Sequence, residues 1–382
     1  MPMPKHIAII AGEESGDHHS ADLVKELLFH DPSLQFSGMG GKHMQEAGVN
    51  IVANLAQFGV IGITAVIRHA FVIKKTFSII KKHLKETKPD LVILVDCPGF
   101  NIPLAKFAKH KLGLRIIYYI SPQIWAWKAN RIHTLKACVD HMVVIFPFEK
   151  EIYQNAGIPV SFVGHPLVKR IKPSKEIEEI YQCLELPKNK RLIALLPGSR
   201  RSEIEKHLPV LVKTAENLAL THQNLHFVIP IAQTLNPQLI KDFFKNSSIK
   251  ISFINGQAID VLACSHYVVV ASGTASLECA LMEKPMCIIY KGSFLSYLIA
   301  AKVIKVKYLG LCNLLQNKMI VPELLQYDCN TTELTKTLNN LISDNLLQKK
   351  ITTRLAALKQ SLSSEQADCS MVDVVKRELC KV

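Results

Sequence analysis

Several short runs of the sequence contain only apolar residues, with no polar residue at alternate positions. Leu91–Val95 and Val268–Ala271 are the clearest examples. A strand that is apolar on both faces must be covered on both sides, which is typical of parallel sheets packed between helices. Because these runs alternate with helical stretches, the sequence predicts β-α-β units and an α/β fold. The expected strands are His6–Ala11, Leu34–Gly38, Leu91–Val95, Arg115–Ile120, Met142–Phe146, Ser161–Val163, Leu192–Leu196, His226–Ile231, Lys250–Ile254, Tyr267–Ala271 and Met286–Tyr290.

The pattern of strands and helices restarts after Pro166. A charged segment separates this point from a new apolar strand that begins at Leu192. The chain has 382 residues, and a single hydrophobic core usually stops growing near 250–300 residues, roughly. We therefore predict two Rossmann-like parallel-sheet domains of similar size, residues 1–167 and 168–350. A helical tail, 351–382, follows and can return to the first domain.

Composition narrows the class of protein. Hydrophobic residues make up 48% of the chain, which excludes a disordered protein. The ten cysteines include no C-x-x-C pair, which argues against a zinc ribbon, and their density is too low for a disulfide-built secreted domain. No window supplies the roughly 20 apolar residues of a membrane-spanning helix, and the N-terminus lacks the apolar stretch of a secretory signal. These features predict a cytoplasmic protein with free thiols.

The positive charge of the chain is concentrated in amphipathic segments. Lys and Arg number 46 against 32 Asp and Glu, a formal net charge of +14. Segment Arg68–Lys88 interleaves seven basic residues with apolar residues spaced by three and four, and Phe294–Leu311 repeats the combination. Such helices suit an anionic membrane surface. Nucleic acid is the rival partner, but the sequence contains no RNP, KH or C₂H₂ pattern, so we expect no nucleic-acid binding.

Polar loops follow two strands of the first half, where ligands of parallel sheets bind. The loop 11–17 contains Gly12 and Gly16, and either Ser15 or Asp17 caps the following helix or the loop contacts a ligand. Asp96 follows a wholly apolar strand, where a carboxylate is costly to bury. It is therefore either a catalytic acid or the cap of a helix that starts near Ile102.

Two loops of the second half have the composition of anion sites. Gly198, Ser199 and Arg200 precede a helix, where free N–H groups and the arginine can bind phosphate, although Ser199 or Ser202 can also simply cap that helix. The loop 271–278 places Thr274 and Glu278 one turn apart on a helix, so that both can reach one ligand. The alternative is that Thr274 caps the helix and Glu278 interacts with its dipole.

Two further segments are ambiguous. Segment Tyr119–Trp127 holds both tryptophans of the chain, which either pack in the core or shape an acceptor pocket. His165 follows Gly164 at the end of the first domain, where a lone histidine is usually structural.

Taken in order, these loops resemble the lipid-A-disaccharide synthase family, bacterial inverting glycosyltransferases of the two-Rossmann (GT-B) architecture. The resemblance covers nearly the whole chain, and it implies that the two domains face one another across a cleft. The segments that carry it are Ala11–Asp17, Asp96–Asn101, Ser121–Trp127, Phe146–Glu149, Gly164–Pro166, Leu195–Arg200, Ala271–Glu278 and Leu311–Leu315.

The resemblance implies transfer of 2,3-diacylglucosamine from its UDP derivative to 2,3-diacylglucosamine 1-phosphate, which forms a β-1,6-linked disaccharide phosphate and UDP. It implies Asp96 as the general base of a single inverting displacement, and neither cofactor nor metal. The helix N-termini after Gly198 and Gly273, with Arg200, would stabilise the departing pyrophosphate. The residues implied in binding the UDP-sugar are Ser199, Arg200, Gly273, Thr274, Glu278, Asn313, Glu13 and Ser15.

The resemblance also bears on location and assembly. The family's membrane-facing segment matches Gly62–Ile73, which implies a protein peripherally associated with the inner membrane, and a homodimer is compatible with the family. Gly99 stands where some members carry a second acid, so we expect one catalytic carboxylate. Two alternatives remain at this point: another two-Rossmann UDP-sugar enzyme (a 2-epimerase or a lipid-intermediate glycosyltransferase), or a non-catalytic basic module that binds membranes or RNA. The preferred acyl-chain length and the roles of His18, His19 and His165 stay open.

Overall fold

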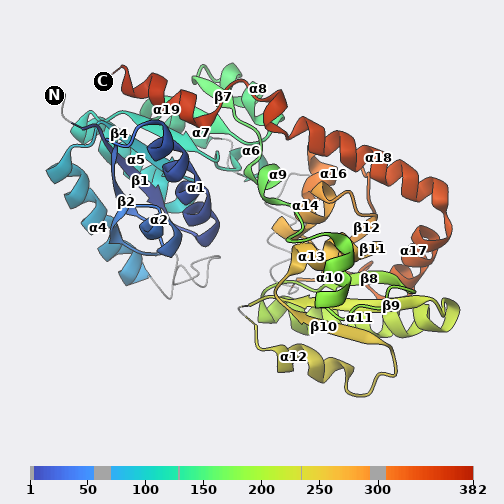
Figure 1. Ribbon diagram of the computed structural model, residues 1–382. Coiled ribbons are helices and arrows are strands. Elements are labelled where there is room, and N and C mark those ends of the chain that lie inside the picture. Colours follow the sequence, from blue (N-terminus) through green and yellow to red (C-terminus); the bar gives the residue numbers. More distant parts are fainter. Residues whose placement is uncertain (1–3, 56–69, 128–129, 234, 293–306, 382) are drawn as a thin grey trace. The chain divides into compact units, whose positions relative to one another are not determined.

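The chain folds into two compact units that each contain one parallel β-sheet with helices packed on it (Figure 1). The computed structural model describes residues 4–55, 70–127, 130–233, 235–292 and 307–381. The first unit comprises residues 1–166 and 362–382, and the second comprises residues 167–361. The α/β class with two parallel-sheet domains, expected from the apolar runs, is confirmed.

The first unit contains a seven-stranded sheet with the order β3-β2-β1-β4-β5-β6-β7. Its strands are β1 (His6–Ala11), β2 (Gln35–Met39), β3 (Asn50–Ala53), β4 (Leu91–Val95), β5 (Ile116–Tyr119), β6 (His141–Val144) and β7 (Val160–Phe162). Its helices are α1 (Glu14–His30), α2 (Lys42–Glu46), α4 (Ala70–Thr87), α5 (Pro98–Leu112), α6 (Ile124–Trp127), α7 (Arg131–Cys138), α8 (Pro147–Asn155) and α19 (Met371–Leu379).

The second unit contains a six-stranded sheet with the order β10-β9-β8-β11-β12-β13. Its strands are β8 (Arg191–Leu196), β9 (Leu225–Ile231), β10 (Ile251–Asn255), β11 (Tyr267–Ala271), β12 (Met286–Tyr290) and β13 (Glu323–Leu325). Its helices are α9 (Pro166–Arg170), α10 (Ile177–Cys183), α11 (Arg201–Thr221), α12 (Pro237–Lys241), α13 (Ala258–Cys264), α14 (Thr274–Leu281), α16 (Leu311–Leu315), α17 (Thr331–Ser343) and α18 (Asn345–Ser361).

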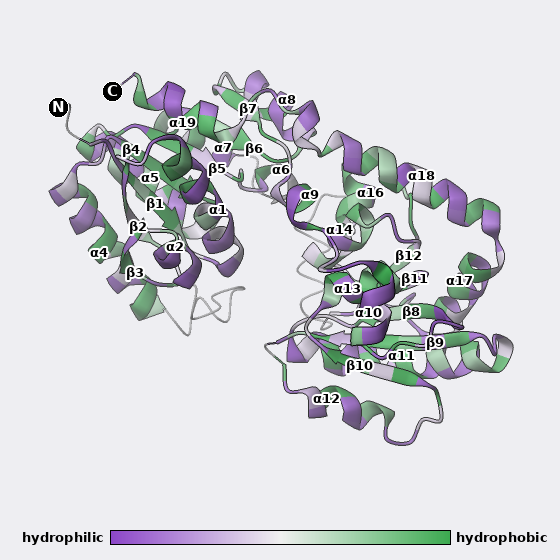
Figure 2. Ribbon diagram, in the orientation of Figure 1, coloured by the Kyte–Doolittle hydropathy of each residue, from purple (hydrophilic) through white to green (hydrophobic). Residues whose placement is uncertain are grey.

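In both sheets the strand order reverses at one pair of central strands, because the strands that follow in sequence are added first on one side of this pair and then on the other. We call this point the reversal of the sheet. In the first unit β1 pairs with β4, with Ala11 opposite Val95, and in the second β8 pairs with β11, with Leu196 opposite Val270. Every residue of β4 and β11 is buried, because helices cover both faces of these strands. Figure 2 shows this distribution, with hydrophobic residues along the central strands and helices that carry both hydrophobic and hydrophilic residues. A ligand site at such a reversal lies beyond the carboxyl ends of the two strands.

All eleven predicted strands are present; four have the predicted ends, and the ends of the others differ by at most two residues. The structure adds two strands that the sequence pattern missed, β3 and β13. Both lie at an edge of their sheet, and none of their residues is fully buried. An edge strand needs no apolar residues on both faces, so the criterion that found the central strands could not detect them.

The C-terminal segment is shared between the two units. Helix α18 belongs to the second unit and α19 to the first, so the structure divides the chain after Ser361, inside the segment expected as a single tail from residue 351. The carboxylate of Glu378 in α19 is buried and accepts hydrogen bonds from Arg115 Nε at 2.6 Å and Lys381 Nζ at 2.7 Å. These charge-assisted contacts, with the apolar face of α19, hold the end of the chain on the first unit.

The predicted basic amphipathic helix is present as α4. Ile80 and Leu84 are buried, whereas Lys74 and Lys75 are exposed and Phe71 is 80% exposed. The start of the predicted helix and most of Phe294–Leu311 lie outside the described residues. Among the described residues, no helix is long and apolar enough to cross a membrane.

Candidate active site

Asp96 lies immediately after β4, at the reversal of the first sheet. Its φ is +46° and that of Cys97 is +45°, so two consecutive residues with side chains adopt the left-handed conformation. This conformation is uncommon outside glycine, although aspartate tolerates it better than most residues. Helix α5 then begins at Pro98 with Cys97 as its N-cap, which excludes the alternative that Asp96 caps this helix.

Two buried side chains hold this turn in place. Asn101 Nδ2 donates to the carbonyl oxygens of Val95 at 3.0 Å and Asp96 at 2.8 Å, and Tyr118 Oη donates to the Asp96 carbonyl at 2.6 Å. Gly12 approaches from the end of β1, and a Cβ there would lie 2.7 Å from Cys97 Sγ. The turn is therefore held by hydrogen bonds and by the close approach of Gly12, and unfavourable backbone angles of this kind are frequent at functional sites.

Burial keeps a proton on the Asp96 carboxyl group more strongly than in water. Desolvation, with a further contribution from the nearby charge of Glu13, raises the pKa of Asp96 from 3.8 to about 7. Glu13 precedes α1 at the end of β1, so the pairing of β1 with β4 accounts for the proximity of the two acids. A carboxylate with a pKa near neutrality is suited to accept a proton from a substrate hydroxyl.

Sequence reasoning did not single out a third acid, Glu149. It lies in the first turn of α8 and is 1% exposed. Its Oε1 accepts hydrogen bonds from Ser121 Oγ at 2.7 Å and Trp125 Nε1 at 3.1 Å, whereas no described residue donates to its buried Oε2. Burial raises the pKa of Glu149 to about 7, and the charge of Asp96 adds to the effect. The segment Phe146–Glu149, quoted for the family resemblance, was the available signal for this residue.

The histidines and polar residues of this region have mainly structural surroundings. His165 is buried, and desolvation together with His19 lowers its pKa to about 3, so its ring is neutral. His18 stacks on His43 at a centroid distance of 3.6 Å. The expected cap of α1 by Ser15 or Asp17 is wrong, because Glu13 occupies the N-cap position. Ser15 is exposed in the first turn of α1, and Asp17 instead accepts backbone N–H bonds at the start of α2.

The loop after β8 has the expected arrangement of donors, but one of its own acids occupies them. Gly198 has φ +117°, and α11 begins after Arg200, which is the N-cap in place of Ser199 or Ser202. Glu203 Oε2 accepts from the backbone N–H groups of Ser199 at 3.1 Å and Arg200 at 3.3 Å, and Oε1 accepts from the Arg200 guanidinium at 3.2 Å. The Glu203 carboxylate thus accepts from the N–H groups and the guanidinium that the sequence analysis predicted to bind phosphate.

A buried histidine that sequence reasoning missed supports this loop. His207 is 0% exposed in α11, and its Nδ1 lies 2.7 Å from the Pro197 carbonyl oxygen. Its Nε2 accepts from the backbone N–H of Lys291, at the end of β12, at 2.9 Å. Because the Pro197 carbonyl can only accept, Nδ1 carries the proton and the ring is neutral, which agrees with the lowering of its pKa by burial. His207 therefore joins two strand ends of the second sheet.

The loop after β11 lies beside the loop after β8, because these strands are neighbours in the sheet. Gly273 has φ +149° and is exposed, and a Cβ placed there would meet no atom of the described residues within 4 Å. Thr274 is the exposed first residue of α14, and Glu278 lies one turn further along. Burial raises the pKa of Glu278, while Arg170 opposes this effect.

Asn313, which the resemblance implied in contact with the nucleotide, lies in α16. Its side chain is completely buried, with Nδ2 donating to Val321 O at 2.8 Å and to Glu323 Oε1 at 2.7 Å. Its Oδ1 accepts from the N–H groups of Ile320 at 2.7 Å and Val321 at 3.0 Å. Both polar atoms of its side chain have partners within the protein, and the contact of Asn313 with a nucleotide stays a prediction.

The implied site residues thus form two groups, one in each unit. Glu13 and Asp96 come together at the reversal of the first sheet, with Ser15 nearby in α1. In the second unit, the loops that contain Ser199 and Gly273 are adjacent at the other reversal. Within the described residues no three His, Cys, Asp or Glu side chains are grouped as metal ligands would be.

Solved structures with similar folds define the class of protein. The fold resembles a UDP-GlcNAc 2-epimerase from Neisseria meningitidis bound to UDP-GlcNAc, with a TM-score of 0.61 and 14% identity over 99% of this chain and 100% of that chain. It also resembles the glycotransferase of kitacinnamycin, with a TM-score of 0.63 and 13% identity over 99% of this chain and 100% of that chain. At these identities the likeness shows the fold alone, which is the GT-B fold of glycosyltransferases and epimerases.

The sequence identifies the family within that fold. The pattern of the lipid-A-disaccharide synthetase family matches residues 7–377. The lipid-A-disaccharide synthase 1 of Legionella pneumophila strain Philadelphia 1 is 57% identical over 99% of both chains. The lipid-A-disaccharide synthase of Geobacter sulfurreducens is 38% identical over 94% of this chain and 93% of its own. The chain belongs to the lipid-A-disaccharide synthase family.

Replacement of Asp96 by asparagine should stabilise the protein above neutral pH. Since the folded-state pKa of Asp96 is raised to about 7, the wild type loses stability as pH rises from the unfolded-state pKa to that value. Asn tolerates the same left-handed backbone and has no charge to bury. We expect Asp96→Asn to raise the thermal midpoint by about 2–4 °C at pH 8, and not at all near pH 4.

Scanning calorimetry across this pH range measures the effect, with the exposed Asp328→Asn as the matched control. An equal midpoint for wild type and Asp96→Asn at pH 8 would contradict the assignment of Asp96 as a destabilising buried acid.

Proposed function

We propose that this chain transfers 2,3-diacylglucosamine from UDP-2,3-diacylglucosamine to the 6-hydroxyl of 2,3-diacylglucosamine 1-phosphate, with Asp96 as the general base. The observation that carries the proposal is the coincidence of two findings. The family match spans residues 7–377, and the acid implied as the base lies at the reversal of the first sheet with a pKa near neutrality.

The proposed reaction is one displacement. The ionised Asp96 carboxylate takes the proton of the acceptor hydroxyl, whose oxygen forms a bond to the anomeric carbon of the donor. The bond between that carbon and the UDP oxygen breaks, and UDP leaves with the electron pair. Attack opposite the leaving group inverts the anomeric configuration, so the protein needs no covalent nucleophile.

The second unit supplies the groups that this proposal assigns to UDP. At the N-terminus of α14, Gly273 and Thr274 are both exposed within the part of the chain that the structure describes. The N-terminus of α11, with Ser199 and Arg200, offers further donors once Glu203 yields them to a phosphate. Glu278 would accept from ribose hydroxyls, which favours its ionised form over the protonated form that burial favours.

Turnover of defined substrates tests the proposal. We expect the purified full-length chain to convert the diacylated donor and acceptor to disaccharide phosphate and UDP, detected by mass spectrometry. Asp96→Asn should reduce kcat by about 10²–10⁴-fold while the protein stays folded, because general-base catalysis contributes this much. Wild-type epimerisation of unacylated UDP-N-acetylglucosamine, without formation of disaccharide, would instead favour the 2-epimerase alternative. Full activity of Asp96→Asn would show that Asp96 is not the general base.

The pH dependence of turnover should report the interaction between Glu13 and Asp96. If Asp96 must be ionised, kcat/KM falls below about pH 7, the pKa to which burial and Glu13 raise this group. Glu13→Gln removes one of the two causes of the raised pKa, so the acidic limb of the profile should move to lower pH. The measured quantity is the pH at which kcat/KM falls to half its maximum. It does not depend on how large that maximum is.

The exposed neighbour Glu14 offers the matched control, Glu14→Gln, which should leave the limb in place. A limb at the same pH in wild type and Glu13→Gln would show that the group titrating in the profile is not Asp96 under the influence of Glu13.

Peripheral association with an anionic membrane is a second part of the proposal. It rests on the net charge of +14 and on α4, whose exposed lysines Lys74 and Lys75 lie near the exposed ring of Phe71. Such a face combines electrostatic attraction to anionic lipid with an apolar side chain that can insert. A cytoplasmic enzyme at the inner membrane, as a homodimer or a monomer, is compatible with this arrangement.

Vesicle sedimentation tests the membrane part. The double variant Lys74→Glu/Lys75→Glu should bind phosphatidylglycerol vesicles at least about tenfold more weakly than wild type, because each basic residue near the surface contributes on the order of 1 kcal/mol. Lys349→Glu/Lys350→Glu on the exposed side of α18 changes the net charge equally and is the control. Equal weakening in both variants would assign the binding to net charge alone and contradict a specific role of α4.

A further inference from the structure

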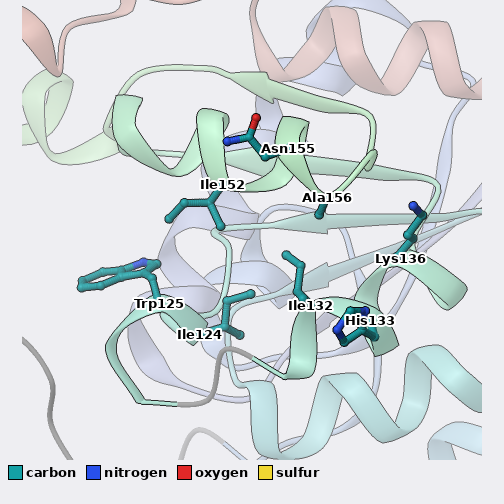
Figure 3. Close-up of a pocket in the computed structure, with 8 residues that line it drawn as sticks. All are labelled: Ile124, Trp125, Ile132, His133, Lys136, Ile152, Asn155 and Ala156. Carbon is teal, nitrogen blue, oxygen red and sulfur yellow. The ribbon is translucent and has the colours of Figure 1, made fainter.

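An apolar cavity of about 460 Å³ opens between α6, α7 and α8 in the first unit. Figure 3 shows its lining, with Ile124 and Ile132 on one side and Ile152 and Ala156 on the other. Trp125 lies at one end and Lys136 at the other. The volume and the mainly apolar lining are those of small-molecule sites rather than of packing defects.

The wall at the Trp125 end is held rigidly. The indole Nε1 donates to the buried carboxylate of Glu149 at 3.1 Å, and the indole ring meets Phe148 edge-on at a centroid distance of 5.0 Å. Ser121 donates to the same carboxylate oxygen, so the segment after β5 is tied to the start of α8 at two points. A partly exposed tryptophan fixed in this way presents a preformed apolar surface.

This end of the cavity adjoins the region of Asp96. Strands β4 and β5 are paired with Val95 opposite Tyr119, so the segments that follow them leave the same edge of the sheet. Glu149, which holds Trp125, is close enough to Asp96 for their charges to interact. From there the cavity runs along α7, from Ile132 to Lys136, a rise of about 6 Å.

The far end is bounded by the Lys136 side chain. Its Nζ lies 3.2 Å from the position that a Cβ would take at Gly157, so it spans from α7 to the turn after α8. The other polar lining residues are His133 and Asn155, and the rest of the lining is apolar. A mainly apolar cavity that is open to solvent and bounded by a lysine suits a flexible aliphatic chain better than a sugar, which needs several converging hydrogen-bond partners.

We propose that this cavity binds one acyl chain of the acceptor, and that Trp125 forms its entrance next to the reacting sugar. The inference rests on the proposed function, because it takes the acceptor to be the diacylated sugar whose hydroxyl is deprotonated by Asp96. It identifies a chain-length determinant that the sequence could not reveal.

Kinetics with acceptors of graded acyl length test the proposal. Ala156→Phe places a ring in the cavity, and Ala137→Phe makes the same change at an exposed position of α7. We expect Ala156→Phe to lower kcat/KM for the long-chain acceptor at least about tenfold, because several buried methylene contacts are lost, and to leave short-chain acceptors nearly unchanged. Ala137→Phe should follow the wild type at every length, and donor chain length should have no differential effect.

Fluorescence supplies a readout that does not depend on turnover. The chain contains two tryptophans, so Trp127→Phe leaves Trp125 as the only one. An acceptor brominated on an acyl chain should quench Trp125 saturably, and the same acceptor should fail to quench when Ala156→Phe is combined with Trp127→Phe.

The two proposals fail in different ways. A wild-type chain that turns over no acylated pair contradicts the proposed function, while the quenching still reports on the cavity. An active wild type with identical acceptor-length profiles for Ala156→Phe and Ala137→Phe overturns the cavity assignment. Quenching that persists in the Ala156→Phe double variant overturns it as well.

Discussion

The requirement to cover apolar strands on both faces determines where chemistry can occur in this molecule. Strands β4 and β11 are buried along their whole length, so polar side chains are confined to the loops beyond their carboxyl ends. In each unit the strand order reverses next to these strands, and a reversal separates the helices that follow the two strands. The acid pair of the first unit and the glycine loops of the second lie at these two reversals.

Buried polar side chains then convert these loops into fixed geometries. Asn101, Tyr118 and His207 direct their hydrogen bonds to backbone groups of the site loops rather than toward solvent. Each satisfies groups that would otherwise be buried without a partner, so removal of either side of such a bond is costly. The unfavourable backbone conformation of Asp96 is maintained by these surroundings.

The sequence predicted the fold and the site best where the residues of a single strand or loop determine the local structure. The apolar runs predicted the central strands, and Asp96 was found because a carboxylate at the end of such a run is unusual. Glu149 and His207 were missed because their partners are distant: Ser121 is 28 residues from Glu149, and Lys291 is 84 residues from His207. For Asn313, the resemblance implied a nucleotide contact, and only the packing around it shows that the polar atoms of its side chain already have partners within the protein.

The return of α19 to the first unit has a consequence for biosynthesis. Arg115 and Glu378 are 263 positions apart along the chain, so this contact cannot form until the ribosome has synthesised residue 378. The second unit is continuous from 167 to 361 and is complete earlier. The usual N-terminal-first order of domain folding during synthesis is therefore unavailable here. A nascent chain arrested before α19 would display an incompletely covered first sheet, the kind of surface that chaperones bind.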